Sequence, residues 1–192
     1  MIKKLIPFTL VIGLAACSAD NNVSRNNPAE IGFVEPENKI EYSIQELNIS
    51  VPRDLVVSES NAYYPTADIV WHGDGQGNRY QQIDAIFQTA IKSGVSDLNG
   101  ARDVILDIQV TRFHSLTNKA RYTVGGVHSI SFTYALRDSK TNEIVALPKA
   151  VIADLTAFGG TRALKAERAG QGQKQRIMAH LAKVIRKELT LK

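Results

Sequence analysis

The residues with the clearest chemical potential lie in one glycine-rich segment, Trp71-His72-Gly73-Asp74-Gly75-Gln76-Gly77-Asn78-Arg79. A glycine-rich turn at the start of a helix can present backbone N–H groups to an anion, and Arg79 would add positive charge. The spacing fits neither the P-loop nor the dinucleotide-binding fingerprint, and Asp74 would repel a phosphate. The alternative is a strand-to-helix turn that needs glycine dihedrals and a cap, which is the commoner role. The candidate ligand or anion turn, 72–79, comprises His72, Gly73, Asp74, Gly75, Gly77 and Arg79.

Other groups that could catalyse a reaction or bind a metal lack the partners that their chemistry needs. The four histidines are His72, His114, His128 and His180, and no two of them form an HxxxH or HxH pair. His114 and His128 fall on neighbouring predicted strands. A zinc site needs three or four converging ligands, so we expect no metal site. No G-x-S-x-G motif supports a serine nucleophile. We therefore predict no enzymatic activity, no catalytic residue and no cofactor.

The first sixteen residues have the pattern of an export signal. Lys3 and Lys4 form a short positive region, and the apolar run that follows is shorter than the roughly 20 residues that span a membrane. This run ends in Leu14-Ala15-Ala16-Cys17, which resembles the lipobox of bacterial lipoproteins. The resemblance implies cleavage after Ala16, a diacylglycerol thioether on Cys17 and acylation of the new amine by a chain such as palmitate. The alternative is an ordinary secretory signal that happens to contain a cysteine.

Lipid attachment at Cys17 predicts a protein anchored to a membrane and facing the periplasm. Each buried methylene contributes about 0.8 kcal/mol, so several acyl chains hold a protein stably where one chain binds marginally. Ser18 follows the cysteine. By resemblance to the sorting rule of enteric bacteria, a residue other than aspartate at this position implies the outer membrane.

The composition predicts one globular domain and disfavours nucleic acid as a partner. The formal net charge of the 192 residues is +4, and removal of residues 1–16 with their two lysines lowers it to +2. A nucleic-acid site needs a concentrated positive surface, and no basic run interleaved with aromatic residues supplies one. Residues 17–39 are polar and asparagine-rich, which predicts a lipidated flexible tether. Residues 40–192 are expected to form a single domain.

The apolar pattern predicts a fold of the α+β class. Apolar residues recur every three or four positions over 78–98 and 173–191, which predicts two helices, and Asn78 can cap the first. Alternation of apolar and polar residues predicts strands over 41–50, 104–113 and 121–136, with a bend or bulge at Gly125-Gly126. A further strand is predicted over 144–158, where Pro148 marks a bulge or an edge position. The expected architecture is a two-layer sandwich, in which two helices pack on one face of an antiparallel sheet of about four strands.

This layout resembles that of small envelope lipoproteins, namely the auxiliary lipoproteins of ABC-type lipid transporters and the lipopolysaccharide-assembly lipoprotein. Residues 67–74 and 173–177 also resemble an uncharacterised family of proteobacterial lipoproteins. With the predicted anchor, the resemblance implies a non-catalytic accessory or binding component of a cell-envelope transport or assembly system, whose partner is an envelope protein complex. One alternative is a periplasmic small-ligand binder or enzyme that uses the 72–79 turn. Another is a structural protein of the wall or membrane, because a shared layout does not fix function.

Overall fold

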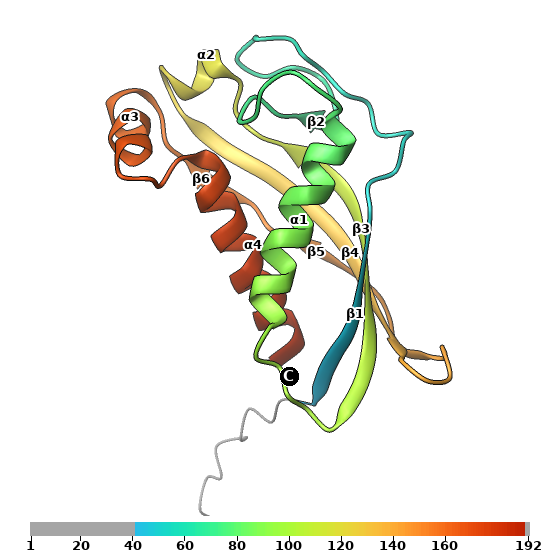
Figure 1. Cartoon of the computed structure of the whole chain (residues 1–192). Coiled ribbons are helices and arrows are strands. Elements are labelled where there is room, and N and C mark those ends of the chain that lie inside the picture. Colours follow the sequence, from blue (N-terminus) through green and yellow to red (C-terminus); the bar gives the residue numbers. More distant parts are fainter. Residues whose placement is uncertain (1–40, 191–192) are drawn as a thin grey trace, which may run out of the picture. The chain divides into compact units, whose positions relative to one another are not determined.

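The domain is built on a sheet of six strands, described over residues 41–190 of the computed structural model. The strands are β1 (Tyr42–Ser50), β2 (Ile69–Val70), β3 (Arg102–His114), β4 (Gly126–Asp138), β5 (Ile144–Ile152) and β6 (Leu155–Ala157). The order across the sheet is β1-β3-β4-β5, while β2 pairs with β3 and β6 pairs with β4 (Figure 1).

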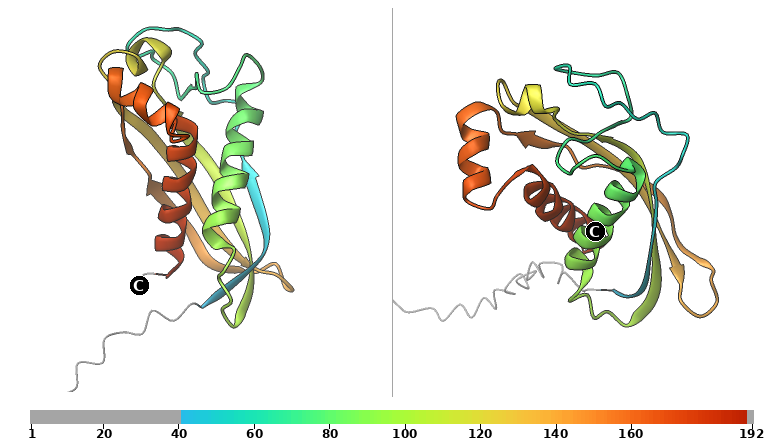
Figure 2. Two further views of the ribbon diagram at one scale, coloured as in Figure 1. Left: turned by 60° about the vertical axis from the view of Figure 1, so that its left-hand side comes forward. Right: turned by 45° about the horizontal axis from the view of Figure 1, so that its top comes forward.

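Two long helices cover one face of this sheet, and two short helices lie near one of its ends (Figures 1 and 2). The helices are α1 (Arg79–Val95), α2 (Asn118–Arg121), α3 (Gly160–Arg168) and α4 (Gln173–Thr190). α1 begins at the predicted cap, where Asn78 Oδ1 accepts a hydrogen bond from the backbone N–H of Gln81 at 3.2 Å. Both long helices occupy the ranges that their apolar spacing predicts.

The sheet is mixed, which corrects the prediction of an antiparallel sheet of about four strands. β1 and β2 run parallel to β3, whereas β4 is antiparallel to both β3 and β5. The chain passes through α1 between β1 and β3, and a crossover that contains a helix is the connection that parallel neighbours need. Alternation within each strand does not reveal its direction, so the parallel pair was not apparent from the sequence.

The core lies between the helices and the sheet. Alternate side chains of β3 and β4 point toward the helices and are buried there: Val104, Leu106, Ile108, Val110, Ile130, Phe132, Tyr134 and Leu136. The ring of Phe87, on α1, meets Phe132 edge-on at 5.7 Å between centroids, and Trp71 meets Phe113 in the same way at 5.5 Å. These contacts join α1, the sheet and the segment before α1 in one apolar core.

α1 and α4 pack closely at a glycine. A Cβ atom placed on Gly94 would lie 2.5 Å from the backbone oxygen of Ala182 and 2.8 Å from Ile185 Cγ2. Only a residue without a side chain therefore allows this distance between the helices. α4 contributes four large buried residues, Ile177, Leu181, Ile185 and Leu189.

Two segments depart from the predicted strands. The alternation that begins at Arg121 is not strand there, because 118–121 form α2, whose N-cap Thr117 accepts a hydrogen bond from the N–H of Ala120. Gly125 then takes a φ of +75°, and β4 starts only at Gly126. The predicted strand 144–158 is divided into β5 and β6. Its expected irregularity at Pro148 is confirmed, since the β4–β5 register shifts between Tyr134 and Leu136.

Several predictions lie outside the described residues. These are the signal peptide over 1–16, lipidation of Cys17 and the tether over 17–39. Among residues 41–190, no helix is both long and apolar enough to span a bilayer.

Candidate functional site

Asp74 of the predicted ligand turn is bound to two other parts of the domain. Its carboxylate accepts a hydrogen bond from Trp71 Nε1 at 3.0 Å and forms an ion pair with Lys174 of α4, whose Nζ lies 2.7 Å from Oδ1. Burial raises the pKa of Asp74, but hydrogen bonds from Lys174 and Trp71 outweigh it and hold the pKa below the ordinary value. Asp74 is therefore an anion that links the turn to the last helix.

Arg79 is buried, and most of its N–H groups donate hydrogen bonds within the domain. Its Nε and Nη2 donate to the two carboxylate oxygens of Glu59, each at 2.7 Å. Its Nη1 donates to Gly75 O at 3.0 Å and to Gln82 Oε1 at 2.6 Å. A guanidinium has five N–H donors, and these contacts use four of them. The hydrogen bonds from Arg79 to Glu59 raise the pKa of Arg79, so its charge serves an internal ion pair.

The structure brings only part of the predicted turn together around a hollow. His72, Asp74, Gly77 and Arg79 line a space of about 480 Å³, whereas Gly73 and Gly75 do not. A Cβ atom on Gly73 would collide with the ring of Trp71, which explains the glycine by packing. Burial lowers the pKa of His72, and its Nε2 has no hydrogen-bond partner within 41–190. The contacts of Asp74 and Arg79 favour a structural role for this turn.

The two histidines expected on neighbouring strands each have a partner of their own. His114 Nε2 lies 2.9 Å from Pro65 O, and its ring packs on Tyr64 at 4.3 Å between centroids. His128 Nδ1 shares a hydrogen bond of 2.9 Å with Ser115 Oγ. Within residues 41–190, no three His, Cys, Asp or Glu side chains gather closely enough to hold a metal ion.

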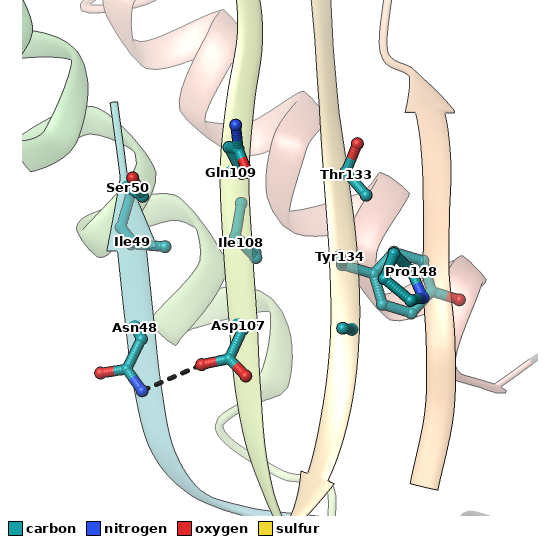
Figure 3. A pocket seen from close by; sticks show the side chains of 10 residues that line it. Asn48, Ile49, Ser50, Asp107, Ile108, Gln109, Thr133, Tyr134 and Pro148 are labelled. Carbon is teal, nitrogen blue, oxygen red and sulfur yellow. Dashed lines mark hydrogen bonds between the residues drawn. The ribbon is translucent and has the colours of Figure 1, made fainter. Parts of the chain in front are cut away.

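The open face of the sheet is the second candidate site. Figure 3 views it from the side opposite the helices, where β1, β3, β4 and β5 lie side by side. They line a shallow hollow of about 250 Å³. We define the open-face patch as the residues on this side of the sheet, namely Asn48, Ser50, Asp107, Gln109, Thr133, Ala135, Pro148, Ala150 and Ile152.

Polar contacts between side chains of neighbouring strands form the floor of the open-face patch. Asn48 Nδ2 donates to Asp107 Oδ1 at 3.1 Å, as Figure 3 shows, and Arg137 Nη2 donates to the same oxygen at 2.7 Å. Hydrogen bonds from Arg137 lower the pKa of Asp107, since they outweigh its burial. The side chains at the centre of the patch, Thr133 and Ala135, are short, so a partner can approach the strands closely.

The border of the open-face patch is apolar. β5 exposes three large side chains to solvent, Ile152 at 80%, Leu147 at 76% and Ile144 at 62%. Single exposed apolar residues are common, but a group of them on one edge strand marks a contact surface more often. The sequence predicted helices on one face of the sheet, but it did not reveal this apolar border on the other face. The signal was Ile144-Val145-Ala146-Leu147-Pro148, an apolar run without the alternation of a half-buried strand.

Comparison with known proteins gives a family and no activity. No curated protein of similar sequence was found. Among solved structures, one similar chain is described as a candidate lipoprotein from Caulobacter crescentus CB15, with 17% identity over 55% of this chain and 79% of that chain and a TM-score of 0.36. A DUF330 protein from Xanthomonas campestris has 15% identity over 78% of this chain and 81% of its own, with a TM-score of 0.45. Residues 42–192 match one family model, and the chain therefore belongs to DUF6778, a family of unknown function.

Proposed function

We propose that this protein is a lipid-anchored accessory component of the bacterial cell envelope that binds a partner protein through the open-face patch. It faces the periplasm from the outer membrane, and its partner belongs to a transport or assembly system. The observation that carries the proposal is the uncovered sheet face with its apolar border on β5, where Ile152 is 80% exposed. A partner protein would bury the exposed apolar side chains of β5, and the hydrogen-bonded polar groups beside them could face the partner without losing their own contacts.

The membrane part of the proposal rests on the lipobox-like end of the signal. Acyl chains on Cys17 would hold the domain at the bilayer, and the polar residues 17–39 would let it reach a neighbouring complex. We expect the wild-type protein to be processed and to sediment with outer membranes. The Cys17→Ser variant should remain unprocessed and lose the lipid label. Normal processing and sedimentation of Cys17→Ser would overturn the anchor and leave the docking proposal to be tested by itself.

The docking part is tested by crosslinking in intact cells. A photoreactive amino acid is placed at Thr133, in the centre of the open-face patch, or at Thr89, which is exposed on the outer side of α1. After irradiation, adducts are identified by mass spectrometry. We expect Thr133 to yield one envelope protein, the same protein to be recovered from Gln109, and Thr89 not to yield it. Recovery of only the uncrosslinked protein from Thr133 and Gln109 would contradict the proposal.

A further inference from the structure

A cavity beneath α3 contains polar groups that the open-face patch does not use. α3 and α4 form two of its walls, and the end of α2 and the start of β4 complete it. Its lining includes Arg121, His128, Phe158, Glu167, Gln173 and Arg176. The space inside is about 10 Å³, which is room for roughly one water molecule. In this arrangement the cavity has no room for a larger ligand.

Arginine side chains give the cavity an excess of positive charge. Arg121 forms an ion pair with Glu167 of α3. The guanidinium of Arg176 lies 3.4 Å from the centroid of the Phe158 ring, and that of Arg162 lies 3.8 Å from the same centroid. Burial and the nearby charge of Arg162 both lower the pKa of Arg176. Two guanidinium groups, those of Arg121 and Arg176, therefore line the cavity with a single carboxylate, that of Glu167.

Two buried polar side chains in the cavity wall lack partners. His128 is 1% exposed, and although Nδ1 is bonded to Ser115 Oγ, Nε2 has no hydrogen-bond partner in the described part of the chain. Gln173 is 7% exposed, and neither Oε1 nor Nε2 of its amide has a partner among residues 41–190. Buried polar atoms are nearly always hydrogen-bonded, so an unpaired imidazole nitrogen and an unpaired amide beside two arginines indicate a polar ligand.

We propose that this cavity is a binding site for a phosphate group, and that the Glu167 carboxylate occupies part of the site when α3 is closed. Arg121 and Arg176 would bind the phosphate oxygens, as guanidinium groups commonly do. If Ser115 Oγ donates to His128 Nδ1, the imidazole carries its proton on Nε2 and can donate it to the phosphate. The Gln173 amide supplies a further donor from α4. These four side chains come from α2, β4 and α4, so their donors approach from different directions. Such an arrangement suits a tetrahedral anion better than a planar carboxylate.

Few apolar contacts hold α3 over the cavity. Of its nine residues only Ala163 is buried, so little apolar contact holds the helix in place. Glycines in the left-handed region lie at both ends, Gly160 with a φ of +52° and Gly170 with a φ of +71°. Displacement of α3 would withdraw Glu167 and enlarge the cavity in one step. Phosphate and Glu167 therefore compete for Arg121.

The test is a titration of the full-length protein with inorganic phosphate at constant ionic strength, followed by calorimetry. We expect weak binding to the wild type and binding about tenfold tighter to Glu167→Gln, because the competing carboxylate is lost. Arg121→Gln and Arg176→Gln should weaken binding by about tenfold or more. Glu188→Gln is the matched control, because it breaks the Lys149–Glu188 ion pair elsewhere on the domain and should leave the affinity unchanged.

Two results would overturn the site. One is no heat of binding for either the wild type or Glu167→Gln at phosphate concentrations up to about 10 mM, a limit that corresponds to about 2.7 kcal/mol. The other is equal affinity in every variant, which would mean that an adventitious ion is bound. Should Arg121→Gln not fold, Arg121→Lys keeps the charge without the planar fork and must still weaken binding.

The source of the phosphate is distinguished by a second ligand. A short-chain phosphatidic acid is titrated into the wild type and Glu167→Gln under the same conditions. Affinity equal to or above that of inorganic phosphate, with the same gain in Glu167→Gln, would identify a lipid headgroup as the ligand. Binding of inorganic phosphate alone would identify the free anion.

Discussion

Lys174 of α4 and Asp74 of the turn before α1 form an ion pair across 100 residues of sequence, with Nζ 2.7 Å from one carboxylate oxygen and 2.9 Å from the other. The same carboxylate accepts a hydrogen bond from the indole of Trp71, a fully buried core residue. One side chain thus connects the start of α1, the core and the last helix. The turn that looked most like a ligand site in the sequence has a clear structural task.

The Asp74→Ala substitution should therefore destabilise the domain. It leaves the half-buried Lys174 and the N–H of the buried Trp71 without their acceptor, so we expect the free energy of unfolding to fall by about 1–2 kcal/mol. Urea denaturation measures the change, and Asp54→Ala, at an exposed position, is the control. Unchanged stability in Asp74→Ala would contradict the structural role and favour ligand binding by the 72–79 turn.

His128 should make the domain less stable in mild acid. Burial first, then the charges of Arg176 and Arg121, lower the pKa of His128 from 6.5 to about 3. The unfolded chain therefore binds this proton near pH 6.5, whereas the folded protein does not until about pH 3. Protonation favours the unfolded state throughout that window, so stability falls as the pH drops below 6.5.

At pH 5 the loss due to His128 should be about 2 kcal/mol. Urea denaturation of the wild type at pH 7.5 and pH 5.0 measures it, and His128→Gln should lose less between the two values because its amide does not titrate. Groups other than His128 are present in both proteins, so their contributions cancel in the comparison. An NMR titration in which His128 takes up a proton near pH 6.5 in the folded protein would disprove this prediction.

Gly94→Ala should force α1 and α4 apart. The added methyl would lie 2.5 Å from Ala182 O, which is backbone and has little freedom to shift. We expect a loss of about 1–3 kcal/mol in the free energy of unfolding, although alanine favours a helix more than glycine does. Ser93→Ala, at the exposed neighbouring position of α1, should be neutral or slightly stabilising. Equal thermal midpoints for both variants would mean that the helices tolerate a wider separation.

Thr133→Arg should abolish docking without unfolding the domain, if the proposed function is right. The long charged side chain would project from the centre of the open-face patch, where the hollow leaves room for it. We expect the in-cell adduct from Gln109 to fall by about tenfold, while the free energy of unfolding stays within about 0.5 kcal/mol of the wild type. Thr89→Arg makes the same change on α1 and should leave the adduct intact. An undiminished adduct in Thr133→Arg would place the contact elsewhere.

Periodicity alone predicted the elements that build the core. The apolar spacing of α1 and α4, the cap at Asn78 and the alternation of β3 and β4 all agree with the structure. These features can be predicted locally, because one side of each helix or strand faces the core along its whole length and the other side does not. The parallel pairing of β1 with β3 is not local, since it depends on where the chain returns after α1. The alternation of apolar and polar residues over 121–124 was also misleading, because the chain there follows α2, a short helix capped by Thr117, and does not form a strand.

The candidate sites were less accessible from the sequence. The position of the 72–79 turn was predicted correctly, but Glu59 and Lys174 determine what Arg79 and Asp74 can do, and both are distant in the chain. The cavity beneath α3 assembles Arg121, His128 and Arg176 from three separate segments. No spacing rule connects such residues, because only the folded chain brings them together.

The position of α4 has a consequence for biosynthesis. Ile177, Leu181 and Ile185 are fully buried, so the core lacks one wall until residues 173–190 have been made. A nascent chain on the ribosome would keep its sheet and α1 partly uncovered and could not settle into the finished domain. If the chain is exported as proposed, this late closure of the core would keep it unfolded until it has crossed the membrane.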